Sequence, residues 1–353
     1  MKAAVLYGRE DVRVEERAPA PLQPGEVRVA IGAALTCGTD LKVFKRGYHA
    51  KMIVPPAVFG HEFAGTICEV SETVAANWKI GQRVVAANSA PCGQCFLCRH
   101  GQENLCDNLL FLNGAYAESI VVPARIVQKN LLPLKSTTTF RDAALTEPLA
   151  CVVQGMNDAG IRGNQSVLVI GAGPIGLMFV ALAKAAGCEV SVAGRGIERL
   201  RKARELGAAW VVEAGEGTDL VATWPIDQAT ARGVAGFDVV IEAVGKAETW
   251  EASMRLVRKG GTVNFFGGCP QGAVVRLETD RIHYSSLTLR ASFHHQPATI
   301  RRALELIETG VIRARDFVDG ECGLEELPGL FHSMSRGNRA VKTLIRTAGA
   351  ESF

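Results

Sequence analysis

An apolar run, a glycine-rich turn and a helical pattern follow one another in SVLVIGAGPIGLMFVALAKAAG, which covers residues 166–187. The run Ser166–Gly173 predicts a buried strand ending in glycine, and Pro174–Gly187 has the spacing of a helix that stops at its final glycine. The turn between them, GAGPIG, fits the G-x-G-x-x-G pattern of dinucleotide-binding loops. We therefore predict a strand–loop–helix unit that binds a dinucleotide. A tight turn without a ligand is the alternative.

The residue types of this loop suit a pyrophosphate. The first glycine permits the tight turn, the second lets the pyrophosphate approach the backbone, and the third packs the helix on the strand. The helix N-terminus then faces the phosphate groups. The predicted cofactor-binding residues of the loop are Gly171, Gly173, Pro174, Ile175 and Gly176.

The end of the next strand indicates which dinucleotide binds. An acidic residue about 20 residues after the loop usually holds the ribose 2′-hydroxyl of NAD, but here the strand CEVSVA ends in Gly194 and Arg195. Glycine leaves room for a 2′-phosphate and arginine pairs with one, and Arg199 lies one helical turn further. These residues favour NADP(H) over NAD(H). In the alternative, Arg195 is solvated and Glu198 replaces the missing acid.

The order of the predicted elements divides the 353-residue chain into two domains. Residues 1–90 contain short alternating strands separated by turns, which predicts an all-β region such as a partly open barrel. After Pro148 strands and helices alternate, which predicts a parallel doubly wound sheet of the α/β class. The alternation loses its regularity after Leu287, and the helical pattern Pro297–Gly310 follows. Such a chain can return to its first domain, although periodicity alone does not prove it.

Composition excludes several classes of partner. The formal charge is +3 without a polybasic run, so we expect neither nucleic acid nor an anionic membrane as a partner. The N-terminal residues MKAAVLYGRE lack an apolar signal segment, and no run is long enough to span a bilayer. We therefore expect a cytoplasmic protein that acts on a small molecule.

Four cysteines lie close together in PCGQCFLCRHGQENLC, which ends at position 106. In a reducing compartment this spacing indicates metal binding rather than disulfides. Two-residue gaps let successive thiolates face one ion, and four sulfur ligands without an open position describe a structural zinc. An iron–sulfur cluster is the alternative. The predicted ligands, in a lobe of about residues 88–107, are Cys92, Cys95, Cys98 and Cys106.

A further set of metal-binding residue types precedes the dinucleotide loop. Its members are Cys37 in LTCGTDLK, His61 and Glu62 in FGHEFAG, and Glu147 in TEPLA. Cysteine, histidine and carboxylate suit zinc, and three protein ligands with one open position make a catalytic site. A lone cysteine or histidine is more often a core residue. Beside a structural zinc and a dinucleotide loop, the catalytic interpretation is favoured.

The motifs CGTD, GHEFAG, EPLA and GAGPIG, together with the four-cysteine lobe, extend over nearly the whole chain. In these motifs and their order the chain resembles the zinc-dependent medium-chain dehydrogenases, the family of alcohol, sorbitol and threonine dehydrogenases. The resemblance implies a GroES-like catalytic domain over residues 1–149 and 288–353. A Rossmann dinucleotide-binding domain over residues 150–287 would be inserted into it.

The resemblance also implies a catalytic zinc in addition to the structural one, and so two zinc ions per chain. Cys37 and His61 match ligands of the catalytic zinc in the family. Glu62 and Glu147 match two positions at which relatives place a further ligand. Which of the two glutamates binds the resting zinc stays open at this point.

Residues shortly after Cys37 match family positions for proton transfer and orientation. Thr39 matches the hydroxyl that passes on the proton of the substrate. Asp40 matches a carboxylate that orients the zinc-bound histidine, and a helix cap is its alternative. Lys42 stands where many relatives have a histidine, and a lysine is usually charged at neutral pH. The proton path beyond Thr39 is therefore open.

The implied reaction is hydride transfer between an alcohol and a nicotinamide cofactor. Zinc lowers the pKa of a bound alcohol, and the hydride then passes to the nicotinamide. Two alternatives are an NADPH-dependent ketone or enone reductase without catalytic zinc and a non-catalytic NADPH-binding protein. The set Cys37, His61 and Glu62 argues against both.

The sequence limits the substrate only loosely. EPL at Glu147 resembles polyol and threonine dehydrogenases, but Ala87–Ala90 lacks the histidine usual in threonine dehydrogenases. We therefore expect a polyol or sugar-like secondary alcohol. Candidates for substrate contact are Tyr48, His49, Phe293, His294 and His295. A surface position is the alternative for the last two histidines.

The resemblance implies assembly as well, because relatives form dimers or tetramers through the edges of their Rossmann sheets. The segment LTLRAS, Leu287–Ser292, is the candidate edge strand. We expect a homodimer or a homotetramer.

Overall fold

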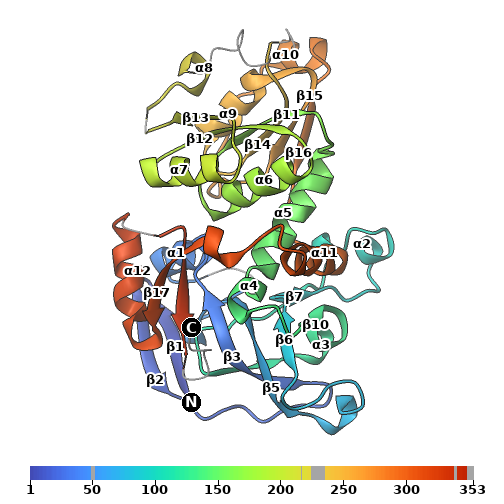
Figure 1. The fold of residues 1–353 in the computed structure, drawn as a ribbon, viewed down its shortest axis with the longest axis vertical. Helices are drawn as coiled ribbons and strands as arrows, with labels where there is room; N and C mark the ends of the chain where they lie inside the picture. Colours follow the sequence, from blue (N-terminus) through green and yellow to red (C-terminus); the bar gives the residue numbers. More distant parts are fainter. Residues whose placement is uncertain (49–51, 216, 224–234, 338–339, 348–353) are drawn as a thin grey trace. The chain divides into compact units, whose positions relative to one another are not determined.

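Figure 1 shows the computed structural model of the chain, which describes residues 1–48, 52–215, 217–223, 235–337 and 340–347. The chain forms two compact units. The first unit combines Met1–Ala150 with His295–Phe353, and the second is the continuous segment Cys151–His294. Within the described part of the chain, none of the helices combines the length and the apolarity that crossing a bilayer requires.

The first unit is built on a seven-stranded sheet. Its strands are β3 (Val27–Leu35), β5 (Glu62–Val70), β6 (Arg83–Ala86), β9 (Ser119–Val122), β10 (Leu131–Pro133), β17 (Val318–Gly323) and β18 (Lys342–Arg346). The order is β10-β6-β5-β3-β18-β17, and β9 also pairs with β3. Because Leu344 of β18 lies opposite Leu35 of β3, the end of the chain completes a sheet that begins near the N-terminus.

Smaller sheets and helices complete the described part of the first unit. A three-stranded sheet contains β1 (Lys2–Gly8), β2 (Asp11–Glu16) and β4 (Ala57–Val58), and β7 (Ser89–Ala90) pairs with β8 (Leu110–Phe111). The α-helices are α1 (Gly38–Arg46), α2 (Phe96–Arg99), α3 (Ala124–Asn130), α4 (Phe140–Ala143), α11 (Pro297–Glu308) and α12 (Leu327–Ser335). Short 3-10 helices cover Glu72–Val74, Glu103–Leu105, Ala314–Asp316 and Leu324–Glu326. Helix α5 (Thr146–Ala159) begins in the first unit and continues into the second.

An aromatic cluster joins the two sequence segments of the first unit. The ring of Phe331, in α12, lies 5.4 Å from that of Phe44 and 5.2 Å from that of Phe59, measured between centroids. Tyr116 packs edge-on against Phe59 at 5.7 Å. All four side chains are buried. The last helix therefore belongs to the same core as the N-terminal strands.

The second unit is a doubly wound α/β fold, as the alternation of strands and helices predicted. Its strands are β11 (Ser166–Ile170), β12 (Glu189–Gly194), β13 (Trp210–Glu213), β14 (Phe237–Glu242), β15 (Val257–Phe265) and β16 (Thr288–Ala291). All neighbours are parallel, in the order β13-β12-β11-β14-β15-β16. The helices are α6 (Pro174–Ala185), α7 (Ile197–Glu205), α8 (Leu220–Thr223), α9 (Ala247–Leu256) and α10 (Thr279–Tyr284). The strand order reverses between β11 and β14, where ligands of such sheets usually bind.

The second unit ends later than the sequence indicated. Strand β16 runs parallel to β15, with Thr288 opposite Thr262. The predicted return to the first domain at residue 288 therefore differs from the structure, in which the first unit resumes at His295. The segment predicted as an edge strand, Leu287–Ser292, contains β16, and its pairing with β15 keeps these residues in the second unit.

Candidate functional site

The cysteine of CGTD stands where a strand gives way to a helix. Cys37 follows β3 and is the N-cap of α1, where its Sγ accepts the backbone N–H of Thr39 at 3.4 Å. The sulfur therefore faces the backbone N–H groups of the first turn of α1. The thiolate form is the one that binds metals.

Asp40 was interpreted either as a helix cap or as the carboxylate that orients the histidine, and its position in the structure agrees with both. Its Oδ2 accepts the backbone N–H of Cys37 at 3.2 Å, which makes it part of the helix cap. Its Oδ1 lies 2.9 Å from Nδ1 of His61. The same carboxylate therefore caps α1 and faces the histidine, and it leaves Nε2 of His61 as the nitrogen that a metal could use.

Cys37, His61 and Glu62 come together in the first unit, although the cysteine belongs to a different motif from the other two. The sulfur, an imidazole nitrogen and a carboxylate oxygen of these residues lie within 4.8 Å of one another. His61 and Glu62 are buried and Cys37 is half-buried. Sulfur, nitrogen and oxygen ligands at this separation form a donor set that suits zinc.

The carboxylate of Glu62 supplies a test of whether a metal fits here. One oxygen, Oε2, is paired with Nζ of Lys342, which also donates to the carbonyl oxygen of Thr36 at 2.9 Å. The other oxygen, Oε1, is buried, and no hydrogen-bond partner faces it among the described residues. Because buried acceptors rarely remain unsatisfied, a ligand on Oε1 is expected. A zinc ion held by Cys37, His61 and this oxygen meets that expectation.

Lys342 was missed by the sequence analysis. Its side chain is 2% exposed and that of Glu62 is 0% exposed, so the pair is shielded from water. Burial raises the pKa of Glu62, and the charge of Lys342 opposes this rise. No local pattern in the sequence could have indicated the lysine, because it comes from β18 at the far end of the chain.

Glu147 lies at the start of α5 and is also buried. Burial raises the pKa of its carboxyl to about 7, the charge of His61 opposes the rise, and that of Glu62 adds to it. The charges of His61 and Glu62 therefore affect the pKa of this carboxyl. Its oxygens, however, do not belong to the cluster of Cys37, His61 and Glu62 atoms that lie within 4.8 Å of one another. The structure thus brings Glu62 into the ligand cluster and places Glu147 beside it.

The candidates for substrate contact differ in exposure. His295 is buried, with Nε2 at 3.0 Å from Oδ1 of Asn88 and 3.9 Å from Oε1 of Glu147, so the surface alternative is wrong for it. Phe293 and Tyr48 are exposed. His294 belongs to the second unit and has a positive φ of 62°. The remaining candidate, position 49, lies outside the described residues.

The residues expected to carry the proton lie along α1. Thr39 is half-buried, next to the sulfur of Cys37 that its N–H contacts. Lys42 is exposed on the same helix. Its exposure fits a charged side chain in contact with water.

The four cysteines of the lobe form a separate cluster in the first unit. Their sulfurs lie within 4.8 Å of one another, with 3.9 Å between those of Cys92 and Cys98 and also between those of Cys95 and Cys106. Four sulfurs bound at zinc–sulfur distances of about 2.3 Å lie roughly 3.8 Å apart in a tetrahedron. The cluster therefore has the dimensions of a closed zinc site. None of the ten cysteines, all of them described, forms a disulfide.

Backbone groups contact one sulfur of this cluster in particular. The N–H groups of Gln94 and Cys95 point at Sγ of Cys92, at 3.5 and 3.4 Å. These contacts lower the pKa of the Cys92 thiol to about 6, which favours the thiolate.

The three glycines of GAGPIG show three different constraints in the second unit. Gly171 has a φ of 119°, and a Cβ at Gly176 would lie 1.8 Å from the carbonyl oxygen of Gly171. A Cβ at Gly173, the N-cap of α6, would meet nothing within 4 Å. The turn and the helix packing thus require the first and third glycines, whereas the second leaves open space at the helix N-terminus, where a pyrophosphate binds in such loops. Pro174 and Ile175 are the first two residues of the helix.

Packing alone explains why Gly194 has no side chain. A Cβ there would lie 2.5 Å from the Cβ of Ala172, inside the glycine loop. The glycine at the end of β12 is thus not by itself a sign of a 2′-phosphate. Arg195 beside it is exposed and Arg199 is half-buried.

Two acidic residues lie near these arginines. Glu198 is exposed and accepts two N–H groups of Arg201, at 2.8 and 3.0 Å, so this carboxylate is already engaged. Glu213, at the end of β13, accepts the backbone N–H of Gly196 at 3.2 Å. The sequence pattern of dinucleotide-binding domains places the ribose-binding acid at the end of the second strand. Glu213 was missed because it lies at the end of the third strand.

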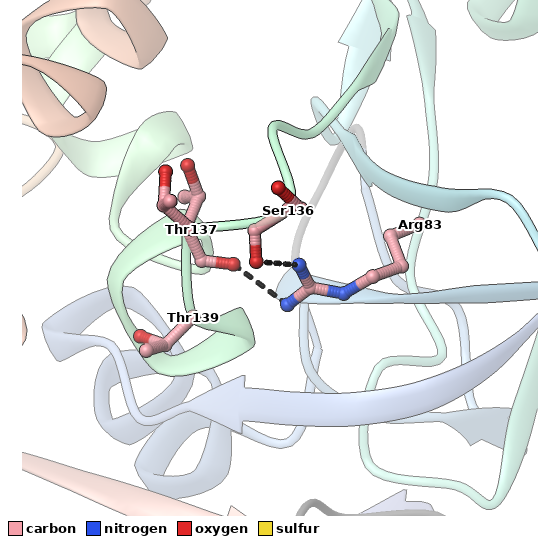
Figure 2. Close-up of a pocket in the computed structure, with 5 residues that line it drawn as sticks. Arg83, Ser136, Thr137 and Thr139 are labelled. Carbon is pink, nitrogen blue, oxygen red and sulfur yellow. Dashed lines mark hydrogen bonds between the residues drawn. The ribbon is translucent and has the colours of Figure 1, made fainter.

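A shallow pocket on the first unit lies apart from these clusters (Figure 2). It is lined by Arg83 and by residues 136–139. The guanidinium of Arg83 donates to the carbonyl oxygens of Ser136 and Thr138 at 3.1 and 2.6 Å. Arg83 therefore anchors a turn here.

Two family models match the chain. The model described as an alcohol dehydrogenase GroES-like domain matches residues 23–133. The model described as a zinc-binding dehydrogenase matches residues 174–309.

Several curated proteins and solved structures are similar over most of their length. D-altritol 5-dehydrogenase of Agrobacterium fabrum is 36% identical, over 84% of this chain and 85% of that protein. D-xylulose reductase A of Aspergillus niger is 30% identical, over 99% and 96% of the two chains. A structure described as a zinc-binding dehydrogenase from Sinorhizobium meliloti 1021, bound to NADP, has a TM-score of 0.87 at 32% identity and covers 98% and 99%. These matches extend across both the β-rich unit and the doubly wound unit, and the chain belongs to the zinc-dependent medium-chain alcohol and polyol dehydrogenase family.

Proposed function

We propose that this chain oxidises a secondary alcohol of a polyol or sugar derivative, and reduces the matching ketone, with a catalytic zinc and NADP(H). The observation that carries the proposal is the cluster of half-buried Cys37 with buried His61 and Glu62, in which one glutamate oxygen has no described hydrogen-bond partner. The similarity to D-altritol 5-dehydrogenase and D-xylulose reductase A supports the polyol class.

When bound, zinc would polarise the oxygen of the substrate as a Lewis acid, and the nicotinamide would exchange the hydride. We assign the zinc to Sγ of Cys37, Nε2 of His61 and Oε1 of Glu62, with Lys342 balancing the charge on the other glutamate oxygen. Glu147 would contact the bound water or substrate, since its carboxyl lies outside the ligand cluster. The hydroxyl of Thr39 would take the proton of the substrate and pass its own proton on toward water, so that it stays neutral.

A structural zinc in the lobe is part of the same proposal. It would be held by the four sulfurs of Cys92, Cys95, Cys98 and Cys106, whose spacing fits a closed tetrahedral site.

The preference for NADP(H) rests on Arg195 and Arg199, and the relative from Sinorhizobium meliloti solved with NADP supports it. Glu213 acts against it, because its carboxylate would repel a 2′-phosphate bound near Gly196. We expect Arg195→Ala to raise the KM for NADP about tenfold or more, since a charge-assisted hydrogen bond is lost, with little change for NAD. Glu213→Gln is the control and should lower the KM for NADP.

The edge strand β16 supports a proposal about assembly. It has a neighbour on one side only in the six-stranded sheet, so a second copy could pair with it. We propose a homodimer or a homotetramer that joins through this edge.

Zinc content tests the proposed function most directly. We expect two zinc ions per chain by elemental analysis, one after Cys37→Ser, and one after Cys95→Ser. Oxidation of a panel of polyols with NADP should be lost in the Cys37→Ser variant. A native protein with one zinc, retained after Cys37→Ser and lost after Cys95→Ser, would falsify the metal-assisted reaction. A zinc-free ketone or enone reductase, or a binding protein without turnover, would then be tested with the same cofactors.

A further inference from the structure

A buried tyrosine contacts the proposed zinc site in a way that the reaction itself does not require. The hydroxyl of Tyr116 donates to Oδ2 of Asp40 at 2.5 Å, and the carbonyl oxygen of Leu35 is a second acceptor at 3.1 Å. The other oxygen of this carboxylate, Oδ1, lies 2.9 Å from Nδ1 of His61. Tyr116, Asp40 and His61 thus form a continuous series of contacts that ends at a proposed metal ligand.

We propose that Tyr116 is a positioning residue of the catalytic zinc site, whose hydroxyl fixes the carboxylate of Asp40 and thereby the ring of His61. The inference rests on the proposed function, because it requires zinc at Cys37, His61 and Glu62. A carboxylate that faces Nδ1 favours the tautomer with its proton there, and this tautomer offers Nε2 to the metal. A donor on its other oxygen keeps the carboxylate from rotating out of that position.

The ring of Tyr116 is held by contacts that do not involve its hydroxyl. Its backbone N–H donates to the carbonyl oxygen of Phe59 at 2.8 Å. Gly60, directly before His61, has a φ of 89°, and a Cβ there would lie 2.7 Å from the tyrosine ring. The ring therefore packs on the backbone that carries the histidine. Phenylalanine would keep these contacts, so Tyr116→Phe removes the hydroxyl alone.

The environment keeps the hydroxyl a donor. Tyr116 is 0% exposed. Burial, and after it the negative charge of Asp40, raises the pKa of its phenol well above the usual value. The hydroxyl is therefore protonated at neutral pH. Without it, Oδ2 of Asp40 would keep only the backbone N–H of Cys37 as a described partner.

The test uses the full chain with both metals and the variant Tyr116→Phe. Loss of such an outer contact typically weakens metal binding about 10–100-fold, and we expect a decrease of this size at the catalytic site. Competition with a chelator measures it, and the zinc of the four-cysteine lobe, which should not change, is the internal reference. With cobalt(II) in the catalytic site, the visible absorption bands should shift. Tyr7→Phe is the matched control, because the hydroxyl of Tyr7 binds Glu15 at 2.8 Å, away from the metal ligands.

A double variant separates a positioning role from a packing role. If the hydroxyl acts through the carboxylate, Tyr116→Phe combined with Asp40→Asn should bind zinc no more weakly than Asp40→Asn alone. Additive losses would overturn the proposal, and so would an unchanged zinc affinity with an unchanged cobalt spectrum in Tyr116→Phe.

A measurement on the unmutated sequence does not depend on the folding of these variants. Replacing the four tyrosines by fluorotyrosine makes each hydroxyl a stronger donor, so the cobalt bands of the native sequence should again move. They should move equally in Tyr7→Phe, which keeps the hydroxyl of Tyr116 on Asp40. Bands that do not respond to fluorination overturn the proposal. A native protein that carries zinc only in the lobe contradicts the proposed function instead.

Discussion

A lysine sealed from water balances the charge of a proposed zinc ligand. Lys342 has two acceptors, the carboxylate of Glu62 and the carbonyl oxygen of Thr36. Burying a charge is unfavourable unless it is paired and hydrogen-bonded. The lysine and the glutamate are therefore each tolerated in the core only because of the other.

Lys342→Met should destabilise the protein strongly. In the zinc-free protein it leaves Glu62 buried without its counter-charge, and removing one partner of a buried ion pair costs about 3–5 kcal/mol. Denaturant unfolding followed by circular dichroism measures the loss. Lys45→Met, at an exposed position on α1, is the control and should change the free energy of unfolding by less than about 0.5 kcal/mol.

A second substitution checks this explanation. Adding Glu62→Gln to Lys342→Met removes the unpaired charge and should recover part of the stability, although the catalytic zinc would be lost. No recovery would mean that Lys342 stabilises the fold by packing rather than by charge.

Residues within one motif could be predicted from the sequence, whereas their partners from distant segments could not. The spacing of the four cysteines indicated a cluster that the structure contains. By contrast, Lys342 is 280 positions from Glu62, and Tyr116 is 76 positions from Asp40. Contacts between residues so far apart in the sequence depend on the packing of whole strands. They cannot be predicted from a local sequence pattern.

At the level of single elements, the glycine loop combines a folding constraint with a binding constraint. The third glycine is needed because the N-terminus of α6 touches the loop at Gly171. The second borders open space. Substitutions at the two positions should therefore have different effects.

Gly173→Ala should leave the thermal unfolding midpoint nearly unchanged but weaken NADP binding, because the added methyl group enters the space for the pyrophosphate. Gly176→Ala should lower the midpoint and weaken binding together, because its Cβ would clash with the backbone. Thermal unfolding with and without NADP separates the two, since a ligand that binds only the folded state raises the midpoint. Equal midpoints for both variants would contradict this assignment.

Most elements could be predicted because their patterns are local. The strands of the β-rich region and the elements around the glycine loop agree with the periodicity. The end of α9 is not marked in the sequence, because no glycine or proline lies in TWEASMRLVRK, residues 249–259, to stop a helix. In the structure the helix ends at Leu256, and Val257 pairs with Phe237 of β14. Strand pairing therefore decided the conformation of these residues.

At the scale of the whole chain, the first unit is discontinuous and the second is continuous. The C-terminal segment supplies a strand beside β3 and the ring of Phe331 to the core of the first unit. The sequence indicated that the chain could return to its first domain. The position of this return becomes clear only from the pairing of β16, which still belongs to the second unit. The two units should differ in whether they fold alone.

We expect a fragment of residues 151–294 to fold and bind NADP by itself, because its sheet is complete. A fragment of residues 1–150 should not fold, because it lacks β17, β18 and α12. Circular dichroism and calorimetric titration with NADP test the two fragments. A cooperative unfolding transition in the 1–150 fragment would show that the last segment is dispensable.

The same discontinuity sets an order of events during translation. The lobe has all four sulfurs once residue 106 has left the ribosome, so it can take up zinc early. The pair between Glu62 and Lys342 forms only after nearly the entire chain has been made. Until then the end of β3, at Ala34 and Leu35, lacks its neighbour in β18, whereas β9 can already pair with the start of β3. An unpaired strand edge invites pairing with other chains. The nascent protein therefore spends most of its synthesis with the four cysteines of the lobe in place and Glu62 without its counter-charge. A chaperone that shields the end of β3 would act in that interval.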